Sequence, residues 1–168
     1  MKIRSFLVTL LALVSLSMQA QMEDPVEFSS QLKTGSSAEG EIVFTGSIEP
    51  GWHVYSTNLP KGGPVSAALT VNKLDGAELV GTLQPGAGEK EQMDDIFGMK
   101  VRFFENKATL TQKVRFTKPT YSIDCSLEYG ACNDQMCMPP MTTEFKQSGK
   151  SPAVDEPKEE KKDERWWK

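Results

Sequence analysis

The chain has 168 residues, and its 23 acidic residues outnumber its 19 Lys and Arg residues, which gives a formal net charge of −4 at pH 7. An acidic protein repels a phosphate backbone, so we do not expect nucleic acid as a partner. About 130 residues remain between the two chain ends, enough for one domain with a core of its own.

Residues 1–20 have the pattern of a secretory signal peptide. Lys2 and Arg4 precede an apolar run from Phe6 to Leu16, and Ala20 is a small residue suited to cleavage. The run is shorter than the ~18 apolar residues that span a bilayer. We therefore expect export, with cleavage near Ala20 and a soluble product. The formal net charge then falls from −4 to −6, because two positive charges leave with the signal.

Between residues 21 and 150 apolar and polar side chains alternate with a period of two, which is typical of β-strands. Turn signals such as Asp75-Gly76 separate the alternating runs, and no run has helical periodicity. The expected strands are residues 41–48, 52–56, 66–72, 78–83, 99–105, 108–116, 121–129 and 142–146. Many short strands in one domain predict an all-β fold, an immunoglobulin-like antiparallel β-sandwich.

Residues 151–168 differ in composition from the rest of the chain. They contain six acidic and five basic residues and two prolines, with no apolar periodicity before Trp166-Trp167. Such a segment cannot bury enough apolar surface to fold alone. We expect a charged linker or tail.

The three cysteines differ in their surroundings. Cys125 falls on the apolar face of the expected strand 121–129 and is predicted to be a buried core residue, since free cysteine is among the most buried residue types. Cys132 and Cys137 follow in a loop. A disulfide between them requires a sharp turn, which Asn133 and Asp134 favour.

The spacing of Cys132 and Cys137 leaves several interpretations open. The pair is either a structural staple or a redox switch, and a ring this small stabilises by only about 2 kcal/mol. Cys125 is an alternative partner for either thiol. The three cysteines and His53 also have the ligand count of a zinc site, but zinc sites usually present two closely spaced pairs, so the spacing argues against a metal.

Three segments, in order along the chain, resemble the N-terminal periplasmic domain of DsbD, the thiol:disulfide interchange protein. They are Gly51–Ser56, similar to an aromatic strand, Asp94–Gly98, similar to a cap loop, and Glu128–Pro140, similar to the active-site hairpin. The resemblance implies an immunoglobulin-fold redox domain in the periplasm. It implies a protein-disulfide reductase type of thiol:disulfide oxidoreductase, with no metal or organic cofactor.

The resemblance also assigns roles and partners. By position, Cys137 matches the cysteine that forms mixed disulfides with partners, and Cys132 matches the one that resolves them. The implied partners are thioredoxin-fold proteins: an electron donor domain and periplasmic clients, including those that serve cytochrome c biogenesis. A membrane electron-transfer domain follows in full-length members of the family, and no small-molecule ligand is expected.

In this family an aromatic side chain of the cap loop shields the cysteines until a partner displaces it. The matching residues are Asp94, Asp95, Ile96, Phe97 and Gly98. Two bulky side chains, Ile96 and Phe97, occupy the shielding positions, and the sequence leaves open which of them covers the sulfur atoms.

The remaining candidate residues surround the cysteine pair. On an alternating strand His53 and Tyr55 share a face, and whether that face looks at the cysteines stays open. The predicted surround is His53, Tyr55, Tyr129, Asp134, Met136 and Pro139. The loop itself carries no Lys, Arg or His, so we expect the reduced thiols to stay protonated at neutral pH until a partner docks.

A second class of function uses the same fold. A non-catalytic, exported β-sandwich binding module would carry the same pair as an inert structural disulfide. The two classes differ in whether the disulfide exchanges with a reduced thioredoxin-like donor.

Overall fold

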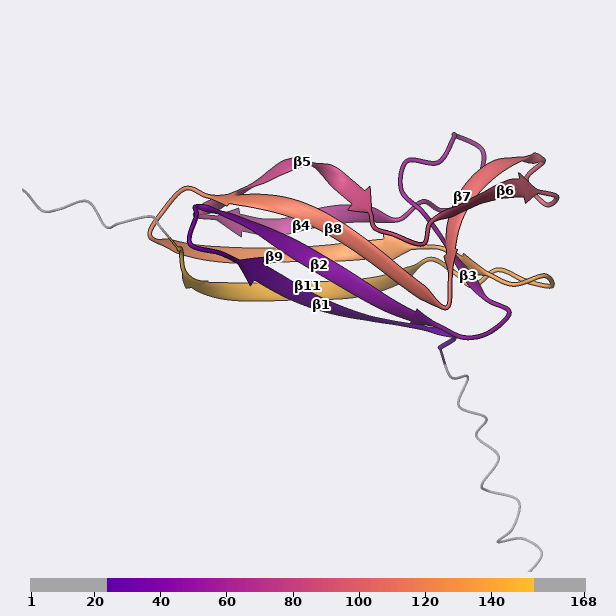
Figure 1. Cartoon of the computed structure of the whole chain (residues 1–168), viewed down its shortest axis with the longest axis horizontal. Coiled ribbons are helices and arrows are strands. Elements are labelled where there is room, and N and C mark those ends of the chain that lie inside the picture. Colours follow the sequence, from indigo (N-terminus) through magenta and orange to yellow (C-terminus); the bar gives the residue numbers. More distant parts are fainter. Residues whose placement is uncertain (1–23, 153–168) are drawn as a thin grey trace, which may run out of the picture.

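The computed structural model describes residues 24–152, which form eleven strands and, within that range, no helix (Figure 1). The strands make three antiparallel sheets. The first sheet contains β1 (Val26–Thr34), β2 (Glu39–Ile48), β8 (Lys107–Phe116) and β5 (Ala77–Pro85), in that order. The second contains β11 (Met141–Lys150), β9 (Thr120–Tyr129) and β4 (Ala68–Asp75), and the third β10 (Ala131–Cys132), β3 (His53–Tyr55), β7 (Met99–Glu105) and β6 (Lys90–Asp94).

The first and second sheets pack face to face because their strands alternate between buried and exposed residues. β8 and β9 show this alternation along their whole length. Phe44 on β2 meets Phe145 on β11 across the interior, with ring centroids 6.5 Å apart. Cys125 is a free thiol in the same interior and is 1% exposed. The prediction that Cys125 is a core residue is confirmed.

The third sheet closes one end of the sandwich, where Figure 1 shows β3, β6 and β7 together. We call it the end sheet. Val54 and Phe104 point from it into the main core and are fully buried. Tyr55 and Phe103 point the opposite way, into a smaller apolar cluster. Strands β3 and β7 of the end sheet therefore carry buried side chains on both faces, and the second face carries the candidate site.

All eight expected strands are present, with ends shifted by a few residues, and the predicted antiparallel all-β sandwich is confirmed. Three strands were not predicted. In β1 serine residues interrupt the apolar alternation, β6 is a polar strand at a sheet edge, and β10 has two residues. The expected signal peptide lies outside the described residues, as does the expected tail beyond residue 152. Over residues 24–152 no helix is long and apolar enough to cross a membrane.

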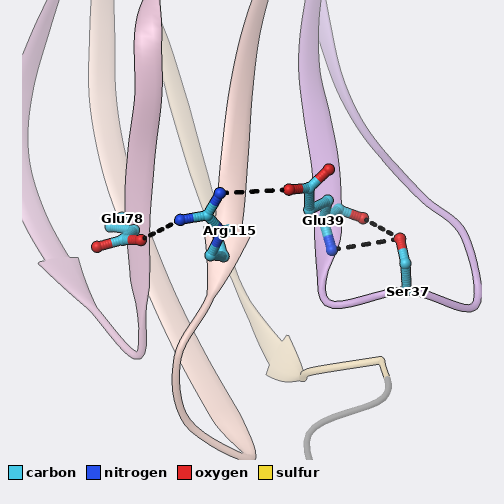
Figure 2. A network of polar contacts seen from close by, with 4 residues as sticks. All are labelled: Ser37, Glu39, Glu78 and Arg115. Carbon is cyan, nitrogen blue, oxygen red and sulfur yellow. Dashed lines mark hydrogen bonds and ion pairs between the residues drawn. The ribbon is translucent and has the colours of Figure 1, made fainter.

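A charged network holds three strands of the first sheet together at the solvent surface (Figure 2). Arg115 on β8 lies directly opposite Glu39 on β2 and Glu78 on β5, and its guanidinium contacts their carboxylates at 3.4 and 3.2 Å. The Ser37 hydroxyl accepts a hydrogen bond from the backbone N–H of Glu39. Exposed ion pairs of this kind contribute about 0–1 kcal/mol, so the network aligns strands more than it stabilises the fold.

Candidate functional site

Cys132 and Cys137 form a disulfide at the end sheet, with Cα atoms 4.0 Å apart. Cys132 is the last residue of β10, and Cys137 makes an isolated antiparallel bridge with it. The structure thereby selects one of the pairings that the sequence left open.

The five-residue step between the cysteines is turned by Asn133. Its side-chain Oδ1 accepts hydrogen bonds from the backbone N–H groups of Gln135 and Met136, at 2.9 and 2.8 Å. Its own backbone N–H donates to the carbonyl of Met136 at 2.9 Å. This local bonding of an asparagine side chain to the following backbone is the property that makes asparagine common in turns.

The two cysteines are unequally exposed. Cys132 is 3% exposed and belongs to the small apolar cluster of the end sheet, whereas Cys137 is an exposed residue. The neighbouring Met136 is also 50% exposed. An approaching protein therefore meets Cys137 first.

The floor of the site is the second face of the end sheet. Cys132 lies directly opposite His53 on β3, and His53 lies opposite Glu105 on β7. Directly opposed residues in antiparallel strands place their side chains on the same face. Tyr55 and Phe103 are the next opposed pair on that face, and both pack in the cluster that contains Cys132. The face shared by His53 and Tyr55 therefore looks at the disulfide.

A cap covers this floor from the hairpin between β6 and β7. Asp94, at the end of β6, accepts hydrogen bonds at Oδ1 from the backbone N–H groups of Ile96 and Phe97, at 2.9 and 3.1 Å. Its other oxygen, Oδ2, accepts a hydrogen bond from the Tyr55 hydroxyl at 2.9 Å. Gly98 completes the turn at φ 63°, a conformation that glycine adopts without steric cost. Asp94 thus ties the cap to the floor.

Phe97, and not Ile96, is the side chain that lies over the floor. Phe97 is half-buried against the cluster that contains Cys132, and its ring is 6.3 Å from that of Tyr55 in an edge-to-face arrangement. Ile96 is 65% exposed. The question that the sequence left open is answered by the Asp94 hydrogen bonds, which fix the direction of the loop.

An apolar hollow of about 170 Å³ lies beside the disulfide. Both cysteines and Phe97 line it, and the segment from Gly63 to Val65 forms the opposite wall. Gly130 allows this wall to approach, because a Cβ atom there would lie 2.9 Å from the Val65 carbonyl oxygen. The hollow is large enough for a single side chain of a visiting protein.

Comparison with known proteins identifies the family of the chain. Residues 19–149 match the family described as thiol:disulfide interchange protein DsbD, N-terminal. The chain belongs to this family. The Cys132–Cys137 pair is disulfide-bonded, and the all-β antiparallel fold is the immunoglobulin-like fold expected from the sequence.

Solved structures give similar folds at low sequence identity. The reduced DsbD N-terminal domain of Neisseria meningitidis is 23% identical, with a TM-score of 0.47 over 74% of this chain and 86% of that chain. The N-terminal periplasmic domain of ScsB from Proteus mirabilis is 12% identical, with a TM-score of 0.50 over 75% of this chain and 46% of that chain. A search of curated proteins found no match.

Two titratable side chains of the floor, His53 and Tyr55, have pKa values shifted by burial. Burial lowers the pKa of His53 below its ordinary value of 6.5, although Asp94, Glu105 and Asp134 each act to raise it. Burial also raises the pKa of Tyr55, and its hydrogen bond to Asp94 raises it further. Both side chains are uncharged at neutral pH. Among the described residues, no cluster of three or more His, Cys, Asp or Glu side chains is placed to hold a metal ion.

One residue of the predicted surround lies elsewhere. The Tyr129 ring is buried in the main core, where it packs against Phe28 with centroids 4.6 Å apart, and its hydroxyl lies 3.5 Å from the Val26 carbonyl oxygen. The expectation that Tyr129 borders the cysteines is therefore wrong. It is close to Cys132 in sequence, but the alternation of β9 turns its side chain inward.

The other predicted residues lie in two groups. His53 and Tyr55 belong to the floor, while Asp134, Met136 and Pro139 are exposed on the cysteine loop. Sequence reasoning missed two parts of the site: Phe103 in the floor and Val65 in the wall of the hollow. The alternation of the strand at 99–105 was a usable signal for Phe103. Nothing in the Gly- and Pro-rich segment around Val65 indicates that it folds back onto the disulfide.

Proposed function

We propose that this domain is a periplasmic electron relay that exchanges its Cys132–Cys137 disulfide with thioredoxin-fold proteins. A thioredoxin-like donor reduces the disulfide, and the resulting dithiol then reduces the disulfides of client proteins. Family membership supports the general chemistry of thiol:disulfide interchange. The relay direction and the choice of partners are our inference.

The observation that carries the proposal is the unequal exposure of the two sulfur-bearing residues. An attacking thiolate must approach one sulfur in line with the disulfide, while the other sulfur leaves. Cys137 is exposed and Cys132 is 3% exposed. We therefore assign Cys137 as the residue that forms mixed disulfides, and Cys132 as the leaving group and resolving thiol.

The setting of the disulfide supports exchange more than stapling. The bridge closes a short ring, which in the chain-entropy model contributes about 2 kcal/mol. The sandwich has a separate core of twenty buried residues. A staple at this position adds little to the fold, whereas an exchangeable pair requires a position at the rim of a rigid scaffold.

The cap provides a gate for the same chemistry. Phe97 covers the cluster that contains Cys132, and Asp94 and Tyr55 hold the loop down. We propose that a docking partner displaces Phe97 and enters the apolar hollow beside the disulfide. Exposed apolar side chains around the cap and the cysteine loop, Met93, Ile96 and Met136, provide an adaptable rim for more than one partner.

Export and the domain limits belong to the same proposal. Residues 1–20 direct the chain to the periplasm, residues 21–150 form the redox domain, and residues 151–168 are a linker or tail. No organic or metal cofactor takes part, because the two electrons move with the sulfur–sulfur bonds.

Trapping tests the proposal. With Cys132→Ser, a mixed disulfide formed through Cys137 cannot be resolved, so thioredoxin-fold partners that carry an oxidised active site accumulate as covalent complexes. Cys137→Ser is the matched control and is expected to trap at most a trace, because Cys132 is buried. Non-reducing electrophoresis and peptide mapping identify the linked residues. Equal trapping by both variants, or by neither, contradicts the assignment.

A further inference from the structure

The one histidine of the chain lies beside the buried cysteine of the disulfide. His53 is the residue of β3 directly opposite Cys132 on β10, and the two side chains emerge on the same face of the end sheet. Side chains in directly opposed positions have Cβ atoms about 4.5–5.5 Å apart. The imidazole and the Cys132 sulfur therefore extend from neighbouring positions on one face of the sheet.

Aromatic rings hold the imidazole in place. Its centroid is 5.0 Å from that of Tyr55 and 5.3 Å from that of Phe103, and it meets both rings edge to face. Tyr55 and Phe103 pack against Cys132 in the small cluster. His53 itself is only partly buried. Part of the imidazole is therefore accessible to solvent.

The charged groups around His53 are mostly acidic. Glu105 on β7 lies directly opposite it, and Asp94 on the cap and Asp134 on the cysteine loop also act on it. Glu105 is also paired with a cation, Lys90 on β6, whose Nζ lies 2.5 Å from its carboxylate. These carboxylates disfavour a thiolate at Cys132.

This arrangement creates a difficulty for the resolving step. Only a thiolate attacks a disulfide, yet Cys132 is 3% exposed, so solvent base has little access to its proton. We infer that His53 is the proton acceptor for Cys132 when this thiol closes the disulfide, and the proton donor to Cys132 when the disulfide opens. The inference rests on the proposed exchange function and deepens it.

The step balances in both directions. In client reduction, Cys137 is already bonded to the partner sulfur. Cys132 gives its proton to a ring nitrogen of His53, and its electron pair attacks the Cys137 sulfur. The partner sulfur leaves as a thiolate with the electron pair of the broken bond, and the imidazolium returns the proton to solvent. In reduction by a donor thiolate the sequence reverses: a ring nitrogen of His53 takes a proton from solvent, Cys132 leaves with the electron pair of the broken bond, and the imidazolium passes that proton to Cys132.

The neutral state of His53 suits this role. Burial keeps its pKa below 6.5, so at neutral pH the ring nitrogen is free to accept a proton. A new negative charge on Cys132 then favours the imidazolium for the short time that both exist.

A small chromogenic disulfide isolates the step. Fully reduced protein is mixed with one equivalent of a bis(nitrobenzoate) disulfide, which releases one coloured thiolate when Cys137 attacks and a second when Cys132 displaces it. The rate of the second release is measured against pH for the wild type, His53→Gln and His53→Phe. Far-UV circular dichroism and thermal melting establish that each variant is folded.

We expect a wild-type second phase that is nearly independent of pH from 6.5 to 8. In both variants the rate of the second phase is expected to be at least about tenfold lower at pH 7, since a thiol with a pKa of about 8.5 is roughly 3% ionised at this pH. The rate is then expected to rise in proportion to the hydroxide concentration. The first phase, which belongs to exposed Cys137, is expected to change less than twofold.

Two outcomes overturn the inference. If all three proteins share one pH profile, His53 takes no proton from Cys132. If His53→Phe has the wild-type rate while His53→Gln is slow, the role of His53 is to pack against Tyr55 and Phe103. The assay contains no protein partner, so its result is separate from that of the relay. If thioredoxin-fold proteins fail to exchange with the disulfide, the proposed function fails whatever the His53 profile.

Discussion

Replacing Asp94 with alanine is expected to open the cap over Cys132. The Asp94 side chain accepts three hydrogen bonds, one from the buried Tyr55 hydroxyl and two from the backbone of Ile96 and Phe97. A bond to a charged acceptor contributes roughly 1.5–3 kcal/mol, and an exposed turn bond about 1 kcal/mol or less. Water replaces these bonds in the open loop, so we set the net loss at about 2 kcal/mol.

The lost hydrogen-bond free energy makes Cys132 more accessible, because it raises the fraction of molecules with an open cap. Because 1.4 kcal/mol is a factor of ten in an equilibrium constant, the open fraction of the cap rises about 30-fold. The assay is alkylation of Cys132 by iodoacetamide in a Cys137→Ser background, followed by mass spectrometry of the peptide. Tyr55→Phe removes only the bond to the charged acceptor, which at the lower end of its range contributes about 1.5 kcal/mol, and is expected to accelerate the reaction about tenfold.

A control variant and a double variant test whether the effect comes from the Asp94 hydrogen bonds. Glu91→Ala removes a carboxylate from the same strand, β6, where it is paired with Lys100 at the surface, and is expected to leave the rate within twofold. The double change Asp94→Ala with Tyr55→Phe is expected to gain little over Asp94→Ala alone, because both remove the same bond. An Asp94→Ala rate within twofold of the parent, in a folded protein, refutes the view that Asp94 holds the cap closed.

Three further predictions concern the scaffold. Burial raises the pKa of Cys125 from 9.0 to about 11, so this thiol stays unlabelled by iodoacetamide at pH 8 until the protein is unfolded. The stability that comes from burying the neutral thiol is fully present below pH 9 and is lost as the pH rises through about 11. Cys125→Ala is therefore expected to reduce the decrease in the free energy of unfolding over this pH range. An unchanged decrease contradicts the prediction. Gly130→Ala forces a Cβ against Val65 and is expected to cost about 1–3 kcal/mol in urea unfolding, with an unchanged midpoint as the contrary result. Arg115→Ala breaks two exposed ion pairs and is expected to lower the free energy of unfolding by less than about 1 kcal/mol, and by less still in high salt. A loss above about 2 kcal/mol would mean that the network of Figure 2 stabilises the fold more than exposed ion pairs do.

Much of the sandwich was predictable because its strands are half-buried. A residue such as Leu127 must face the core and its neighbours must face solvent, so apolar and polar residues alternate along the sequence of the strand. The strand at Lys90–Asp94 was missed for the opposite reason. It is an edge strand with four exposed residues, and its polar side chains carry no periodic signal.

The site was predictable in its chemistry but not in its orientation. The segments around Cys132 and Phe97 identified the family, yet the choice of Phe97 over Ile96 depends on hydrogen bonds to one carboxylate. The position of Tyr129 was misjudged because nearness in sequence was given more weight than strand alternation. The pairing of His53 with Cys132 depends on the register of a two-residue strand, which no sequence pattern specifies.

The most direct test of the relay is to incubate the oxidised protein with a reduced thioredoxin-like donor and to count alkylated cysteines after an acid quench. Because the quench unfolds the protein, Cys125 is labelled in every sample, and we predict that Cys132 and Cys137 become labelled in addition as the donor is oxidised. A structural disulfide, with a potential below about −300 mV, resists such a donor. If the Cys132–Cys137 bond persists while the same donor reduces a known substrate, the account is contradicted.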